Sequence, residues 1–252
     1  VNPDFPNHHP DPTVDSNLKD MIDVIKYGSY DVGIAFDGDA DRIVAVSNKG
    51  EIIRADILLA FFLEFVVKKD DTVVYDVKCS KSLEDIIERL EAKSIMWKTG
   101  HSLIKNKMIE SKSKIGGEMS GHIFFSDNYF GFDDGIYVGL RLLEILSKSS
   151  LSLSEMVSAI PKYFSTPEIR VDCKNDVEKN IVSLELINYF KSKYDCCEID
   201  GVRINYPCGW ALIRSSNTQP VIVFRFEADT KSNLNKIKDE IFNKAKEYNL
   251  NM

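Results

Sequence analysis

The chain has 252 residues, of which 44% are hydrophobic, so it can bury sizeable cores and is expected to form two or three domains. Its formal net charge of −7 leaves no basic footprint for nucleic acid, and the longest apolar run, 57–67, is interrupted by Glu64 and too short to cross a membrane. The five cysteines are odd in number and lack Cys-x-x-Cys spacing, which is typical of reduced thiols in a cytoplasmic protein.

The first fifty residues are predicted to form part of a domain. Four prolines within residues 1–13 favour an extended loop. Helical spacing of apolar residues predicts a helix over 15–26, capped by Asp15 or Ser16. Two strand-length apolar runs follow, 32–36 and 43–46, and the turn signal Asn-Lys-Gly at 48–50 closes the segment.

The residues between these two runs, Asp37 to Arg42, are almost all polar. Asp37, Asp39 and Asp41 place a carboxylate at every second position after a strand, where they would repel one another unless a cation is bound. Oxygen ligands of this kind suit magnesium or calcium better than zinc. A solvated acidic turn is the alternative without a metal.

Two known metal-loop patterns can be compared with this segment. An EF-hand would need glycine at the sixth position and glutamate at the twelfth, but these are Arg42 and Asn48 here. A haloacid-dehalogenase-type phosphatase also has Asp-x-Asp after a strand and would make Asp37 the nucleophile. The residues that follow depart from that family's usual pattern, and it is kept as an alternative.

A new unit is expected to begin near residue 51. A helix apolar nearly all round (55–69) precedes a strand (73–75), a helix capped by Ser82 and running to residue 90, and a strand (94–97). Such alternation implies parallel strands joined by right-handed crossovers. Residues after the strand ends, Lys78, Lys98 and His101, are therefore expected together as anion or hydroxyl contacts.

The stretch 115–125 combines three glycines with polar side chains. Glu118, Ser120 and His122 supply an acceptor, a hydroxyl and an imidazole, a set suited to the hydroxyls of a sugar. An ordinary hairpin, or a core histidine, is the alternative. Helices are predicted over 136–146, capped by Asp133 or Asp134, and over 154–160.

The last segment, 164–252, is predicted to be α+β with an antiparallel sheet. Strands are expected at 168–171, 202–206, 210–213 and 221–226, and helices at 177–193 and 232–248. The loop 214–220 offers a guanidinium and several hydroxyls, which favours a cradle for a phosphate. A plain polar hairpin is the alternative.

Several separated motifs, in this order, resemble the α-D-phosphohexomutase superfamily, with the nearest likeness to the bacterial phosphomannomutase/phosphoglucomutase group. They are FPNHHPDP (5–12), DGDADR (37–42), DVKCS (76–80), WKTGHSLIK (97–105), GEMSGH (117–122), GFDDGIY (131–137), RSSNTQP (214–220) and FRFEAD (224–229). The resemblance covers essentially the whole chain.

The resemblance implies an α/β fold in three parts: the C-terminal part of the second mutase domain (1–50), a complete third α/β domain (51–163) and the C-terminal α+β domain (164–252). It implies a four-domain enzyme with one loop from each domain in its cleft. Such an enzyme interconverts hexose 1- and 6-phosphates, of mannose or glucose, through a bisphosphorylated intermediate. The family's phosphoserine loop has serine followed by histidine, which occurs nowhere here. We therefore expect a C-terminal fragment that needs the missing first domain for turnover.

Site roles also follow from the resemblance. Asp37, Asp39 and Asp41 are expected to bind Mg²⁺, with Arg42 beside it. Glu118 and Ser120 would contact the sugar. The non-reacting phosphate would be bound by Arg214, Ser216, Asn217 and Thr218. The general base is left open among His122, Lys78 and His101, which are also expected to contact substrate. A non-catalytic module binding calcium or carbohydrate is the remaining alternative.

Overall fold

The computed structural model describes residues 2, 4–216, 219–248 and 250, which belong to two compact units, Val1–Pro161 and Lys162–Met252. The predicted fold class is confirmed: the first unit mixes helices with two sheets, and the second is α+β. Among the described residues, no helix has the length and apolar character needed to span a membrane.

The N-terminal part of the first unit is a small antiparallel sheet with a helix against it. The sheet order is β1-β2-β3, and Leu18 and Ile25 of the helical segment pack on Val44 and Val46. The elements are η1 (Asp15–Leu18), α1 (Lys19–Tyr27), β1 (Val32–Phe36), β2 (Ile43–Ser47) and β3 (Ile52–Ile53). The predicted strand pair is present, and β1 and β2 pair in register from Val32–Ser47 to Phe36–Ile43.

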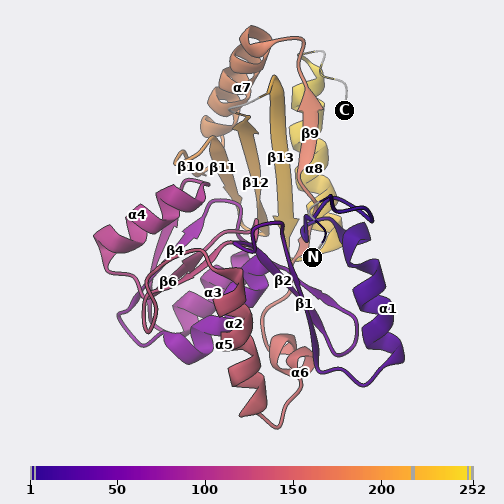
Figure 1. The fold of residues 1–252 in the computed structure, drawn as a ribbon. Coiled ribbons are helices and arrows are strands. Elements are labelled where there is room, and N and C mark those ends of the chain that lie inside the picture. The colour runs from indigo at the N-terminus through magenta and orange to yellow at the C-terminus, as the bar shows by residue number, and fades with distance from the viewer. Residues whose placement is uncertain (1, 3, 217–218, 249, 251–252) are drawn as a thin grey trace. The chain divides into compact units, whose positions relative to one another are not determined.

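The rest of the first unit is built on a four-stranded sheet, β5-β4-β6-β7, with helices on both faces (Figure 1). The predicted parallel pairing holds for β4 with both β5 and β6. Side chains alternate along β4: Val74 packs with α4, whereas Val73 and Tyr75 join the larger core with α2 and α3. The elements are α2 (Ala55–Val66), β4 (Thr72–Asp76), α3 (Lys81–Arg89), β5 (Lys93–Trp97), α4 (His101–Ser111), β6 (Ile115–Gly117), β7 (Ile123–Phe125), α5 (Gly135–Ser147) and α6 (Leu153–Ser158).

Two local expectations in this region are corrected, and one open choice is resolved. Ser80, not Ser82, caps α3, because the Ser80 side chain accepts the Ser82 N–H at the second helical position. Helix α4 was not expected, since only Ile104 and Met108 of its residues are buried and its apolar face is narrow. The open choice at α5 is resolved: Asp134 is its cap.

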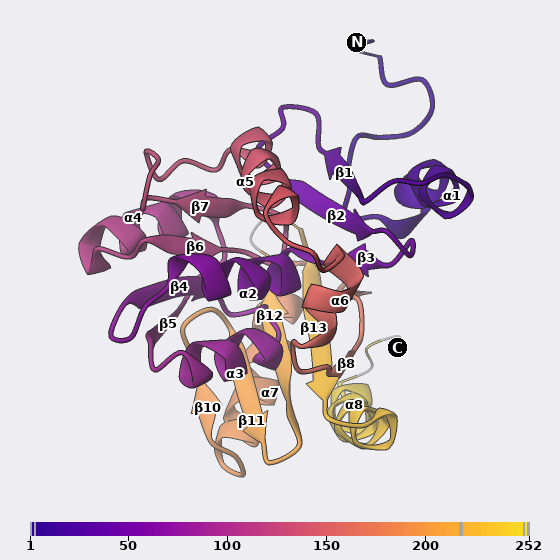
Figure 2. The same ribbon diagram turned by 90° about the horizontal axis from the view of Figure 1, so that it is seen from below.

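Helix α5 joins the two sheets of the first unit. It lies beside β1, β2 and β7 (Figure 2), and one continuous core includes Ile43 of β2, Leu58 of α2 and Val138 of α5. The boundary predicted near residue 50 therefore lies inside one compact unit, and the three-domain division stays a prediction.

The second unit is an antiparallel sheet with both long helices on one face. Ile213, Phe224 and Phe226 point into the core beneath α7 and α8. Strand order is β10-β11-β12-β13-β8, and β9 also pairs with β13. The elements are β8 (Phe164–Ser165), β9 (Ile169–Asp172), α7 (Asp176–Lys191), β10 (Cys196–Cys197), β11 (Val202–Tyr206), β12 (Gly209–Ser215), β13 (Val221–Ala228) and α8 (Lys231–Lys246).

Candidate functional site

The acidic loop, residues 37–42, connects β1 to β2 and brings its carboxylates together. Asp37, Asp39 and Asp41 each offer an oxygen, and these oxygens lie within 4.8 Å of one another. Ala40 adopts a left-handed backbone with φ of +63°, and its N–H donates to the Asp37 carbonyl at 3.3 Å. This tight turn lets the three alternate side chains point to one place, as required of ligands to a single cation.

Arg42 neutralises only part of this charge. Its backbone N–H and its Nε donate to the two oxygens of Asp37, at 3.1 and 2.6 Å. Burial raises the pKa of Asp37, but these hydrogen bonds outweigh it, and the pKa lies below its usual value. Burial, followed by the hydrogen bond to Asp37 and its negative charge, raises the pKa of Asp41 to about 6. The excess negative charge makes the loop a good fit for a hard divalent cation.

The acidic loop rests on two segments from much later in the sequence. The N–H of Ile43 donates to the Gly121 carbonyl at 3.1 Å, and the N–H of Gly135 donates to the Ala40 carbonyl at 2.9 Å. Gly121 has a φ of +120°, and a Cβ there would come within 2.9 Å of the Arg42 Cβ. The close approach of the two loops therefore depends on glycine at this position.

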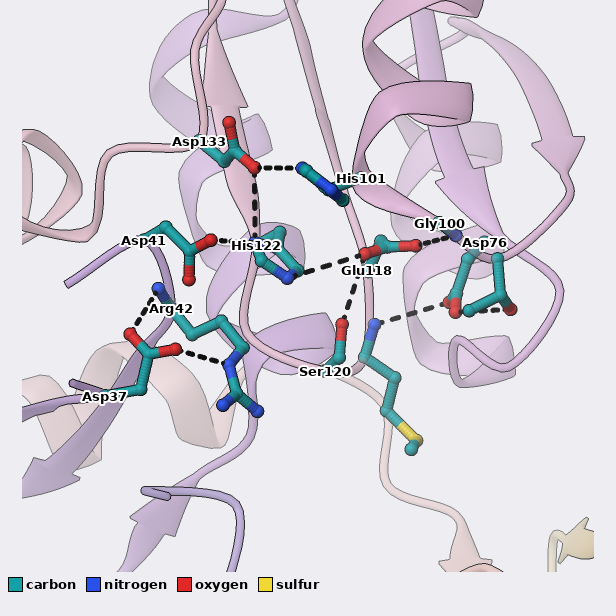
Figure 3. A network of polar contacts seen from close by, with 12 residues as sticks. Asp37, Asp41, Arg42, Asp76, Gly100, His101, Glu118, Ser120, His122 and Asp133 are labelled. Carbon is teal, nitrogen blue, oxygen red and sulfur yellow. Dashed lines mark hydrogen bonds and ion pairs between the residues drawn. The ribbon is translucent and has the colours of Figure 1, made fainter. Parts of the chain in front are cut away.

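Two stacked histidines lie next to the acidic loop (Figure 3). The His101 and His122 ring centroids are 5.3 Å apart, and Asp133 Oδ2 is 2.8 Å from His101 Nδ1 and 3.5 Å from His122 Nδ1. His122 Nδ1 is also 3.7 Å from Asp41 Oδ2. Burial lowers the pKa of His122, outweighing the nearby Asp133, and so favours the neutral ring, which can accept a proton.

Glu118 and Ser120 lie together on the turn between β6 and β7. Ser120 Oγ donates to Glu118 Oε2 at 3.2 Å, and the Gly100 N–H donates to the other oxygen. Glu118 is only 2% exposed; burial, then the charge of Asp76, raises its pKa to about 6. His122 Nε2 is 4.0 Å from Glu118 Oε2, so the predicted sugar-contacting residues form one cluster with the histidines.

The expected grouping of Lys78, Lys98 and His101 is only partly present. Lys78 Nζ is 4.0 Å from Asp76 Oδ2, whereas His101 pairs with Asp133. Lys98 is exposed. The segments after β4 and β5 therefore both supply residues to this region, but Lys78 lies beside Asp76 and His101 lies beside Asp133.

The predicted phosphate loop lies in the second unit, where it is considered by itself. Arg214 Nε is 2.9 Å from Asp200 Oδ2, and the Ser216 N–H donates to the Val221 carbonyl at 2.9 Å. From helix α7, Lys179 Nζ donates to the carbonyls of Ser216 and Gln219, at 2.8 and 3.2 Å. The other two predicted contacts, Asn217 and Thr218, lie outside the described residues.

Three side chains of these clusters have no site role in the sequence-based prediction. Asp133, considered only as a helix cap, joins the two histidines, and the adjacent pair of aspartates in FDDGIY was a usable signal for it. Asp76 ends a parallel strand, a position at which ligand-site residues are common. In the sequence, Lys179 cannot be told apart from the charged residues that an ordinary surface helix exposes to solvent. The sequence therefore offers no signal for its role.

Comparisons with known proteins identify the family of this chain. Family models of phosphoglucomutase/phosphomannomutase match the chain at residues 1–50 (alpha/beta/alpha domain II), 54–164 (alpha/beta/alpha domain III) and 168–244 (C-terminal domain). A phosphomannomutase/phosphoglucomutase from Pseudomonas aeruginosa is 46% identical over 248 residues, which are 98% of this chain and 54% of that protein. A phosphoglucomutase from Neisseria gonorrhoeae is 42% identical over 95% of this chain and 53% of its own length.

A solved structure gives the same result in three dimensions. The crystal structure of a phosphoglucomutase/phosphomannomutase family protein from Burkholderia thailandensis matches with a TM-score of 0.88 and 39% identity, covering 99% of this chain and 54% of that one. The chain thus spans about half the length of the relatives it matches. The matches along nearly its whole length show that the chain belongs to the α-D-phosphohexomutase family and corresponds to the C-terminal portion of its phosphomannomutase/phosphoglucomutase members.

Proposed function

We propose that this chain supplies the cation site, the sugar contacts and the distal phosphate contacts of a cytoplasmic mutase that interconverts hexose 1-phosphate and hexose 6-phosphate. The observation that carries the proposal is the convergence of Asp37, Asp39 and Asp41 beside the loop with Glu118, Ser120 and His122, in a chain of this family. The phosphoryl carrier would be a serine in the family's first domain. That domain belongs to the half of the relatives' length that this chain does not cover.

The acidic loop is proposed to hold Mg²⁺. Its donors are three carboxylates, an all-oxygen set that fits this ion. When bound, Mg²⁺ would offset negative charge on the phosphoryl group in transfer. Arg42 donates to Asp37 through Nε at 2.6 Å and to Asp11 through Nη1 at 3.4 Å, and its guanidinium beside the acidic loop could contact the same phosphate.

His122 is the favoured general base. Its ring lies between the acidic loop and Glu118, and Nδ1 is 3.7 Å from Asp41 Oδ2 and 3.5 Å from Asp133 Oδ2 without a hydrogen bond to either. The negative charge of these carboxylates would favour a proton on Nδ1, and Nε2 could then accept one from a sugar hydroxyl. His101, 54% exposed, and Lys78 are proposed as substrate contacts and remain the alternative bases.

Substrate recognition is proposed to separate sugar from phosphate. Glu118 and Ser120 would contact the hydroxyls of the hexose, either glucose or mannose. The phosphate not in reaction would be bound by Arg214, Ser216, Asn217 and Thr218. A substrate that turns end for end, passing through hexose 1,6-bisphosphate, could then use one phosphate cradle and one cation site for both halves of the reaction.

The proposal is tested by completing the enzyme. The chain is mixed with the separately produced N-terminal half of the Pseudomonas aeruginosa relative, and conversion of glucose 1-phosphate to glucose 6-phosphate is followed with Mg²⁺ and a trace of glucose 1,6-bisphosphate. We expect turnover from the mixture and none from either half alone.

Other results would contradict this. Turnover by the chain alone at an ordinary enzymatic rate would exclude the dependence on a second half. Beryllofluoride trapped on Asp37 would favour the phosphatase alternative. Sugar or metal binding with no phosphoryl transfer in a mixture shown to assemble would favour the non-catalytic module.

A further inference from the structure

Asp76 is a fully buried carboxylate that contacts three separate loops of the first unit. It is the last residue of β4 and is 0% exposed. Its Oδ1 accepts from Cys79 Sγ at 3.1 Å and from the Met119 N–H at 3.3 Å. Its Oδ2 accepts from Thr99 Oγ1 at 3.1 Å.

Each of these loops holds residues of the candidate site. The turn to Cys79 includes Lys78, whose Nζ lies 4.0 Å from Asp76 Oδ2. Thr99 is followed by Gly100, whose N–H donates to Glu118, and then by His101. Met119 lies between Glu118 and Ser120. A single side chain therefore connects the segments after β4, β5 and β6.

The chemistry of these contacts favours positioning over simple packing. A buried carboxylate is strongly disfavoured unless donors surround it, and here the donors come from loops rather than from the strand itself. The Glu118–Gly121 turn is closed by the Gly121 N–H, which donates to the Glu118 carbonyl at 3.2 Å. The Met119 N–H inside this turn donates to Asp76, so this acceptor determines how the turn, with Glu118 and Ser120, lies against the end of β4. Asp76 is too buried to contact a sugar directly.

We propose that Asp76 is a positioning residue that sets the mutual arrangement of Lys78, the Gly100 N–H and the Glu118–Ser120 turn, and thereby the recognition of the sugar. The choice of a phosphosugar as the ligand rests on the proposed function. The coupling between the loops does not, because it follows from the hydrogen bonds to Asp76. It predicts that loss of the Asp76 carboxylate disturbs sugar recognition and leaves the phosphate contacts of the second unit intact.

The first measurement compares two probes on the chain as it stands. Asp76→Ala is expected to weaken binding of glucose 6-phosphate by about tenfold in calorimetry, while binding of inorganic phosphate changes by less than about twofold. Asp76→Asn keeps an oxygen that can accept the Met119 N–H, and should recover most of the lost affinity. Equal loss for both probes, or no loss for either, would overturn the proposal.

A matched control separates positioning from stability. Asp127 is a partly buried carboxylate of the same unit that pairs through both oxygens with Arg141, at 3.2 and 3.0 Å. Asp127→Ala should lower the melting temperature without changing the ratio of the two affinities. A similar change of that ratio in Asp127→Ala would show that general destabilisation is sufficient.

A second measurement needs no ligand. Amide hydrogen exchange at Met119 and Gly100 should become faster in Asp76→Ala relative to exchange in β6, because only the loops lose hydrogen bonds to the Asp76 carboxylate. Should Asp76→Ala fail to fold, Thr99→Val removes one donor and should produce the same pattern on a smaller scale. Failure of the wild-type chain to bind glucose 6-phosphate would count against the proposed function, whereas unchanged loop exchange would count against Asp76.

Discussion

The acidic loop of the first unit and the 214–220 loop of the second, proposed to bind a cation and a phosphate, are supported by different means. The backbone of the acidic loop is held by Gly121 and Gly135, which come from much later in the chain, and burial, followed by the hydrogen bond with Asp37, raises the pKa of Asp41 to about 6. The second loop, which connects the paired strands β12 and β13, is supported from helix α7 by Lys179. Both loops connect antiparallel strands, so the difference lies in their support: backbone hydrogen bonds with the β6–β7 turn and the start of α5 in the first loop, and the side chain of one lysine in the second.

The largest expected effect comes from removing an acidic ligand. Asp37→Ala should lower turnover of the completed enzyme at least about a hundredfold, because charge on the transferring phosphoryl group would lose its counter-ion. Binding of Mn²⁺, followed by paramagnetic line broadening, should weaken in parallel. Asp20→Ala changes the same charge on an exposed face of α1 and serves as the control. Unimpaired Mn²⁺ binding in Asp37→Ala would remove the loop as a cation site.

The second effect concerns the other loop. Arg214→Ala should weaken glucose 6-phosphate binding by about 2–3 kcal/mol, since a charge-assisted contact to a phosphate is lost. Lys236→Ala removes an exposed cation of α8 and should leave the affinity nearly unchanged. Calorimetry on the two variants decides the assignment, and equal affinities in both would contradict it.

A pH effect of intermediate size is specific to the first unit. Because the pKa of buried Glu118 is raised from 4.5 to about 6, the folded state binds more protons than the unfolded chain between these values, and stability falls as pH rises through them. The loss should reach about 2 kcal/mol above pH 6. Glu118→Gln should remove this part of the slope in denaturant unfolding measured without metal, while Glu144→Gln, at an exposed site, should keep it. Identical slopes in wild type and Glu118→Gln would refute the assignment.

The smallest effect tests the support of the hairpin loop. Lys179→Met keeps much of the side-chain volume but removes the donors to Ser216 and Gln219, and should weaken inorganic phosphate binding by about 1 kcal/mol. Lys174→Met, at a lysine whose side chain is 81% exposed, is the matched control. A larger loss in the control than in Lys179→Met would show that the effect is only one of net charge.

Sequence patterns predicted most of the architecture, because the strongly apolar strands and α2 leave few alternatives. The three acidic residues and the Glu118–His122 stretch could be singled out by residue type alone, since a cation site and a sugar site need particular atoms. The contacts that the sequence did not reveal are made between residues that are far apart in the chain and come together only in the fold. Asp133 reaches two histidines only because α5 begins beside the acidic loop, and Asp76 acquires its partners only when three strand ends meet. Helix α4 was not predicted because few of its residues are buried, so its sequence has no clear helical pattern of apolar residues.

The hydrogen bonds from Ile43 to Gly121 and from Gly135 to Ala40 have a consequence for the order of folding. Residues 37–42 alone can form a turn, but their final shape requires β6, β7 and the start of α5 to be in place. Cation affinity should therefore appear late, after the four-stranded sheet has assembled. In a refolding experiment, a metal-sensitive signal should lag behind the burial of the core, and a peptide ending at residue 50 should bind the ion poorly despite containing every ligand.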